Sequence, residues 1–225
     1  MNYVRFYLSF FFVLISSSAH ATLLFSEYVE GSSYNKALEI YNLGDSVDFD
    51  SDSYAIEIYT NGASSASYTL NLTGVISSNA TFVIGNTRAS NSILSAANQL
   101  SGSLNFNGDD AIVLTHNGGI VDRIGQIGFD PGAEWGSGDV STQDNTLRRS
   151  DYILVGDVSA ASVFDPALQW IGYAQDSFSG LGQHSVNRVP DTNLPPVGVP
   201  APGSLVLMIA GMLGLLAAKR PRLAI

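Results

Sequence analysis

Residues 23–42 of this chain read LLFSEYVEGSSYNKALEIYN, and their pattern decides the fold. Apolar and polar residues alternate in both halves, and in the second half Leu38 and Ile40 fall on the face opposite Glu39. Because successive side chains of a strand point to opposite faces, this alternation predicts two half-buried strands. Gly31 and the two serines after it separate the halves, so the stretch predicts a β-hairpin.

Residues 54–60 and 67–72 show the same alternation. Short apolar runs follow at residues 81–84, 111–115 and 120–124, and turn residues separate all these stretches. Short strands at such intervals, with an Asn-Gly turn before the last of them, predict an all-β domain built as an antiparallel β-sandwich or a barrel. Residues 90–100 predict one short helix. Residues 125–182, rich in Gly, Asp and aromatics, predict long loops with one or two edge strands.

Residues 1–21 have the three parts of a secretory signal peptide. Arg5 supplies the cation, residues 6–15 form the apolar run, and Ala19 and Ala21 form the small-residue cleavage pattern. This run is too short for a bilayer core, which needs roughly 20 residues. We expect cleavage after Ala21, with a retained N-terminal anchor as the alternative.

The C-terminal end carries a different signal. Residues 187–203 form a proline-rich linker, residues 204–218 are apolar and uncharged, and residues 219–225 are basic. Proline fixes the backbone dihedral φ and removes amide donors, so we expect an extended linker. An uncharged apolar run closed by cations predicts a transmembrane helix with a cytoplasmic basic tail. A buried core helix is the alternative, although the run lacks a polar face.

This tail resembles the PEP-CTERM sorting signal of Gram-negative bacteria, in which Pro-Glu-Pro precedes a transmembrane stretch and a basic tail. The residues that carry the resemblance are Val199, Pro200, Ala201, Pro202, Lys219, Arg220 and Arg222. Ala201 stands where the family has Glu. The resemblance implies an exosortase-like processing enzyme as a partner, tethering at the inner membrane, and delivery to the cell surface or the extracellular matrix.

Between these ends lies one acidic domain, residues 22–186. All 20 Asp and Glu fall between residues 22 and 198, together with only six of the ten Lys and Arg. Such a surface repels phosphate backbones, so we expect no nucleic-acid partner. The chain has no Cys. The domain therefore depends on its core, without disulfides or thiolate metal sites.

Four blocks of this domain resemble bacterial lamin-tail domains. They are residues 25–42, 104–111 (LNFNGDDA), 122–128 (DRIGQIG) and 146–149 (TLRR). The resemblance spans about residues 23–185 and implies an immunoglobulin-like β-sandwich that accompanies exported nucleases, phosphatases and surface proteins without catalytic activity of its own. Residues 45–52 (DSVDFDSD) depart from the family, which has an apolar-Ser-Gly turn there.

The loop of residues 45–52 is the best candidate for a calcium-binding site. Asp45, Asp48, Asp50 and Asp52 cluster in it, and calcium takes six to eight oxygen ligands. The spacing resembles the start of an EF-hand loop but lacks that motif's later Gly and Glu. The alternative is that an acidic run at a strand edge blocks pairing with other sheets.

Other polar groups also allow two interpretations. Glu27, Glu30, Lys36 and Glu39 indicate a ligand or cation site, or, as we prefer, a solvated strand face with a Glu–Lys pair across the strands. Residues 107–110 (NGDD) predict a turn before a strand, with a metal site as the alternative. Arg148 and Arg149 bind an anion or, as we prefer, pair with nearby acids.

Trp135 and Trp170 each follow an Asp-Pro turn. They predict either exposed aromatic platforms for sugar rings or, as we prefer, core residues beneath long loops.

The chain lacks a Gly-x-Ser-x-Gly elbow, a His-Glu-x-x-His motif and a phosphate-binding Gly-Lys-Ser/Thr loop, so the sequence predicts no enzyme and no cofactor other than possible calcium. We expect a non-catalytic surface or matrix protein that binds extracellular polysaccharide or envelope components. The alternatives are a calcium-dependent adhesion or carbohydrate-binding module and an accessory domain of a secreted hydrolase system.

Overall fold

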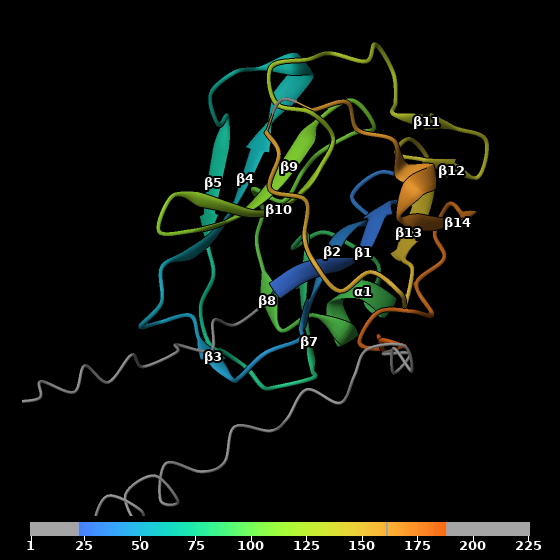
Figure 1. The fold of residues 1–225 in the computed structure, drawn as a ribbon. Coiled ribbons are helices and arrows are strands. Elements are labelled where there is room, and N and C mark those ends of the chain that lie inside the picture. Colours follow the sequence, from blue (N-terminus) through green and yellow to red (C-terminus); the bar gives the residue numbers. More distant parts are fainter. Residues whose placement is uncertain (1–22, 161, 188–225) are drawn as a thin grey trace, which may run out of the picture. The chain divides into compact units, whose positions relative to one another are not determined.

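The computed structural model describes residues 23–160 and 162–187 (Figure 1). The predicted signal peptide, transmembrane segment and basic tail lie outside these residues. Within the described ranges, no helix is long and apolar enough to cross a membrane.

Short strands make up most of the ordered elements. The strands are β1 (Leu23–Glu30), β2 (Lys36–Asn42), β3 (Val47–Asp48), β4 (Tyr54–Tyr59), β5 (Tyr68–Asn71), β6 (Val75–Ile76), β7 (Thr81–Gly85), β8 (Gln99–Leu100), β9 (Ala111–His116), β10 (Gly119–Ile124), β11 (Gly136–Ser137), β12 (Val140–Ser141), β13 (Asn145–Arg149) and β14 (Trp170–Ala174). The helices are α1 (Asn91–Ala96) and the 3-10 turns η1 (Thr60–Gly62) and η2 (Pro166–Leu168). The all-β prediction is confirmed, and the predicted helix is confirmed over a shorter range.

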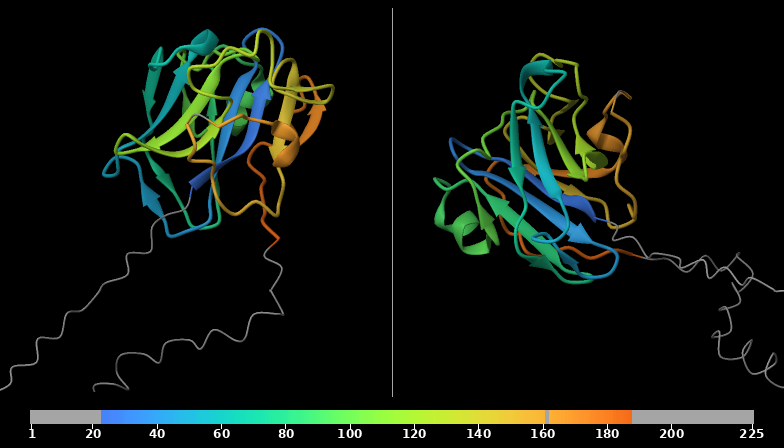
Figure 2. Two further views of the ribbon diagram at one scale, coloured as in Figure 1. Left: turned by 45° about the horizontal axis from the view of Figure 1, so that its top comes forward. Right: turned by 90° about the vertical axis from the view of Figure 1, so that its left-hand side faces the viewer.

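Two sheets pack face to face (Figure 2). Their strand orders are β14-β13-β1-β2-β7-β8 and β10-β9-β4-β5. One core fills the space between them, with Phe25 and Ile40 from the first sheet and Ile56 and Ile112 from the second fully buried. Burial of side chains of this size stabilises the fold by roughly 1.5–3 kcal/mol each. The predicted β-sandwich is therefore confirmed.

One strand pair departs from the antiparallel prediction. β7 and β8 run parallel, with Ile84 opposite Gln99 and Gly85 opposite Leu100. A parallel pair needs a crossover of about a dozen residues, usually helical. Residues 86–98, which contain α1, provide it.

The first hairpin is more deeply buried than alternation predicts. Every residue of β1 and β2 is buried. On the outer face, Ile93 of α1 and Leu181 of the segment after β14 pack against Val29, Ala37 and Val83. The prediction of a solvated strand face is therefore wrong, because two distant segments cover it.

Residues 145–149 form an interior strand. β13 pairs with β1 on one side and with β14 on the other. The prediction of edge strands alone in residues 125–182 is therefore wrong. Both arginines of β13 have carboxylate partners, since Arg148 pairs with Glu27 and Arg149 with Asp122. The preferred interpretation of this basic pair is confirmed.

Candidate binding groove

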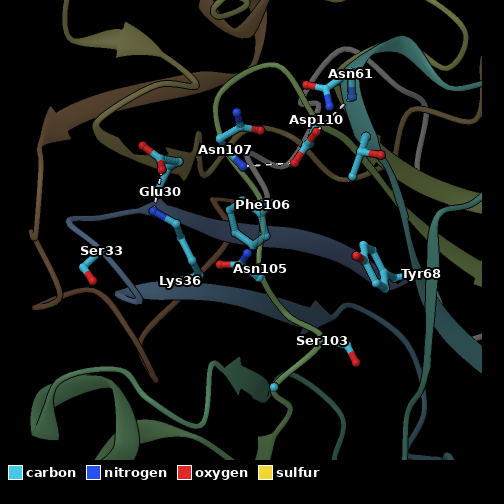
Figure 3. Close-up of a pocket in the computed structure, with 12 residues that line it drawn as sticks. Glu30, Ser33, Lys36, Asn61, Tyr68, Ser103, Asn105, Phe106, Asn107 and Asp110 are labelled. Carbon is cyan, nitrogen blue, oxygen red and sulfur yellow. Dashed lines mark hydrogen bonds and ion pairs between the residues drawn. The ribbon is translucent and has the colours of Figure 1, made fainter.

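A groove of about 600 Å³ opens where the edge strands of the two sheets, β5 and β8, approach each other (Figure 3). One wall comes from η1 and the start of β5. The other wall comes from residues 102–107, which follow β8. The ends of β1 and β2 form the floor. The sandwich thus places three separate parts of the chain around one polar hollow.

Alternation orients the wall that follows β8. Leu104 and Phe106 are buried, while Ser103, Asn105 and Asn107 are exposed. These three polar residues line the groove together with the ring of Phe106. The ring of Phe106 packs 5.1 Å from that of Tyr28, and Asn86 Nδ2 donates to the carbonyl of Leu104 at 2.8 Å. Because the apolar residues anchor this extended segment in the core, its polar residues face the groove.

Asp110 ties the two walls together. Its Oδ1 accepts the amide N–H of Asn61 at 3.0 Å, and its Oδ2 accepts that of Asn107 at 3.1 Å. Burial raises the pKa of Asp110, while these two hydrogen bonds oppose the rise. Asn61 has a φ of +49°, a left-handed conformation that Asn tolerates better than most residues. The predicted turn at residues 107–110 is confirmed, and its last residue also positions η1.

A buried ion pair forms the floor. Lys36 Nζ donates to Glu30 Oε1 at 2.5 Å and to the carbonyl of Gly31, and each side chain of the pair is 7% exposed. The second oxygen of Glu30 accepts the amide N–H of Asp144. The predicted Glu–Lys pair across the strands is confirmed. Because these charged groups are already satisfied, the floor has little capacity to hold a separate ion.

The walls are rich in hydroxyl and amide groups, which donate and accept hydrogen bonds. They include Thr60, Ser103, Asn105 and Asn107. Tyr68 at the rim is 52% exposed and offers a flat apolar ring face. This combination can hold an uncharged ligand that carries many hydroxyl groups.

Two of the four aspartates predicted to bind calcium accept hydrogen bonds from backbone amides. Asp48 Oδ1 accepts the amide N–H of Asp50 at 3.0 Å, and Asp50 Oδ2 accepts that of Gly74 at 3.3 Å. Among the residues that the structure describes, no three His, Asp or Glu side chains are grouped to hold a metal ion, so Asp45 and Asp52 do not complete such a group. Calcium binding stays a prediction.

Both tryptophans are core residues. Trp135 is 5% exposed and packs edge-on against Phe164, while Trp170 is 4% exposed beneath the guanidinium of Arg149. The preferred interpretation is confirmed. The alternative of exposed platforms is wrong, because both rings are buried in the main core.

The residues of the two targeting signals lie outside the described part of the chain and stay predictions. They are Ala19, Ala21, Val199, Pro200, Ala201, Pro202, Lys219, Arg220 and Arg222.

The groove is not evident from the sequence. Asn61, Tyr68 and Asn105 belong to three segments that only the sandwich topology brings together. A local signal was present in LNFN, residues 104–107, where two asparagines alternate with two apolar residues. These asparagines line a groove only because the opposite wall, which comes from about 40 residues earlier in the chain, lies across from them.

A family model described as Lamin Tail Domain matches residues 16–128. The matched range contains β1 to β10 and the whole lining of the groove, whereas β13 and β14 follow it. No curated protein and no solved structure matches the chain.

Proposed function

Because the chain belongs to the lamin tail domain family, a family of non-catalytic immunoglobulin-like modules, we propose that it is a non-catalytic binding module whose groove takes a neutral glycan. The observation that carries this proposal is the lining of hydroxyl and amide groups beside an exposed tyrosine ring. Sugars are bound by hydrogen bonds to such groups and by apolar contact with aromatic faces.

The charges of the groove favour a neutral glycan over an acidic one. Glu30 and Asp110 contribute carboxyl groups, and the ammonium of Lys36 is engaged by Glu30. A uronate group would meet these carboxylates without a free cation, and like charges at close range cost affinity. The acidic domain likewise opposes binding of nucleic acid.

Affinity electrophoresis tests the glycan. We expect migration of the domain to slow in native gels that contain neutral polysaccharides, such as dextran or a plant glucan, and to stay unchanged in alginate. Tyr68→Ala and Asn105→Ala should each weaken retardation at least several-fold. Phe129→Ala is the matched control, since Phe129 is 49% exposed and lies outside the groove. Retardation by alginate alone, or equal loss in the control, would contradict the proposal.

We also propose that the module acts at the cell surface or in the extracellular matrix, where extracellular polysaccharide and envelope components are its partners. The support is the order of elements in the sequence: signal peptide, domain, proline-rich linker, apolar run and basic tail. In this proposal residues 204–218 tether the chain to the inner membrane until an exosortase-like enzyme acts near residues 199–202.

Cell fractionation tests this location. A chain that lacks residues 199–225 should shift from the membrane and surface fractions to the medium or periplasm, while the full chain stays cell-associated. Unchanged surface retention after truncation would show that the tail does not direct sorting.

A further inference from the structure

A second hollow lies along the same edge strand as the groove. It has a volume of about 310 Å³. Its lining consists of Asn71 at the end of β5, the two residues that follow it, and residues from the β3–β4 connection and the start of β4. Tyr68, at the start of β5, lines the groove. Since a strand rises about 3.3 Å per residue, Tyr68 and Asn71 are separated by roughly 10 Å along one seam between the sheets.

A polar clasp crosses this seam at the second hollow. Gln99 of β8 donates from Nε2 to the carbonyl of Asn71 at 3.0 Å, and its Oε1 accepts the amide N–H of Thr73 at 3.1 Å. These two backbone groups point away from β4 and would otherwise pair with an added strand. The clasp therefore occupies part of the β5 edge, which disfavours a peptide that binds by β-strand addition.

Apolar surface flanks the seam on both sheets. Tyr68 of β5 is 52% exposed and Leu100 of β8 is 46% exposed. The polar groups of the two hollows and these apolar side chains lie along the two edge strands, a combination that suits an extended ligand with hydroxyl-bearing edges and apolar ring faces.

Resting on the proposed function, we propose that the ligand is a linear neutral polysaccharide that fills both hollows and passes over the Gln99 clasp. Simultaneous contact with two linked sites raises affinity only when the ligand is long enough to span them. A short oligosaccharide fills the groove alone, whereas a longer one also reaches Asn71 and Thr73.

Calorimetry with a length series of one neutral oligosaccharide, from about two to about eight sugar units, tests this inference. We expect affinity to rise at least tenfold once the chain spans both hollows. The double variant Asn71→Ala/Thr73→Ala should remove this rise and leave short oligosaccharides unaffected, because both residues are exposed and lie outside the groove. Asn91→Ala, exposed on α1, serves as the control.

The outcomes separate this inference from the proposed function. Binding that does not depend on length, or that the double variant leaves unchanged, overturns the second contact and leaves the groove as a glycan site. Absence of binding at every length overturns both. Displacement of a long oligosaccharide by an unfolded polypeptide would assign the seam to a peptide strand and also overturn the inference.

Discussion

Glu27 and Glu39 lie opposite each other on β1 and β2, beneath the segment that follows β14. Arg148 Nε donates to Glu27 at 3.1 Å, while Ser26 Oγ and the amide N–H of Gly182 donate to Glu39. Burial raises the pKa of Glu27 to about 8 despite Arg148, and Glu39 adds repulsion. Burial also raises the pKa of Glu39. The folded protein therefore holds protons here that the unfolded chain releases.

Stability should fall as the pH rises from about 6.5 to 9. Between the usual pKa of 4.5 and the folded value of about 8, the folded state binds more protons at Glu27 than the unfolded state. The contribution of Glu27 to stability is therefore complete below its unfolded pKa, and it is lost as the pH rises through 8. One such proton changes the free energy of unfolding by at most about 1.4 kcal/mol per pH unit. Urea unfolding across this pH range measures the slope.

Glu27→Gln should flatten that slope, because the amide cannot ionise. Asp45→Asn is the control, since Asp45 is exposed, and it should keep the wild-type slope. A Glu27→Gln variant with the same pH dependence as the wild type would show that the proton resides elsewhere. The measurement begins at pH 6.5 because burial lowers the pKa of His184, so protonation of that ring opposes folding in more acidic solution.

Replacing Arg149 should destabilise the core strongly. Arg149 Nη2 lies 3.0 Å from Asp122 Oδ1, and both side chains are fully buried. Removal of one partner leaves an uncompensated buried charge, which costs roughly 3–5 kcal/mol. Arg149→Met should lose about that much in urea unfolding. Arg88→Met, at an exposed arginine over Tyr34, should lose less than about 1 kcal/mol. Similar losses in the two variants would contradict the assignment.

Substitutions at two glycines distinguish the cost of backbone strain from the cost of a steric clash. Gly125 and Gly132 both have positive φ, +83° and +94°. A Cβ at Gly125 would approach the ring of Trp135 within 2.7 Å, while one at Gly132 would meet nothing within 4 Å. Gly132→Ala should therefore cost only the left-handed conformation, about 1–2 kcal/mol, and Gly125→Ala distinctly more. Thermal melting compares them, and equal losses would refute the packing of Trp135 against this turn.

Asp110→Ala should disrupt glycan binding, because it releases the hydrogen bonds that hold both walls of the groove. The amide N–H groups of Asn61 and Asn107, which donate hydrogen bonds to Asp110, would lose their acceptor. This loss should cost about 1–3 kcal/mol in stability. The variant should stay folded by circular dichroism but lose retardation in the neutral-polysaccharide gel. Asp45→Ala should affect neither property. If the neutral-polysaccharide gel retards Asp110→Ala as much as the wild type, the position of the walls does not govern binding.

Local patterns predicted the strands whose residues alternate or form short apolar runs between turns. β4 and β5 lie where residues alternate, β9 lies on a short apolar run, and the Asn-Gly turn after β9 lies where its residues indicate. β13 was missed because NTLRR has only one large apolar residue, and its arginines are tolerated only beside acids more than 25 residues away. The groove was missed for the same reason, since its residues act together only after the edges of the sheets meet.

The position of β13 also sets the order in which the domain can assemble. β1 begins at Leu23, but its second neighbour is formed by residues 145–149. A chain that emerges N-terminus first from a ribosome or a translocation pore thus carries β1 with one unpaired edge until more than 100 further residues follow. An unpaired apolar edge promotes aggregation. We therefore expect the domain to depend on delayed folding or a chaperone during its synthesis, and a fragment that ends at residue 128 to be insoluble.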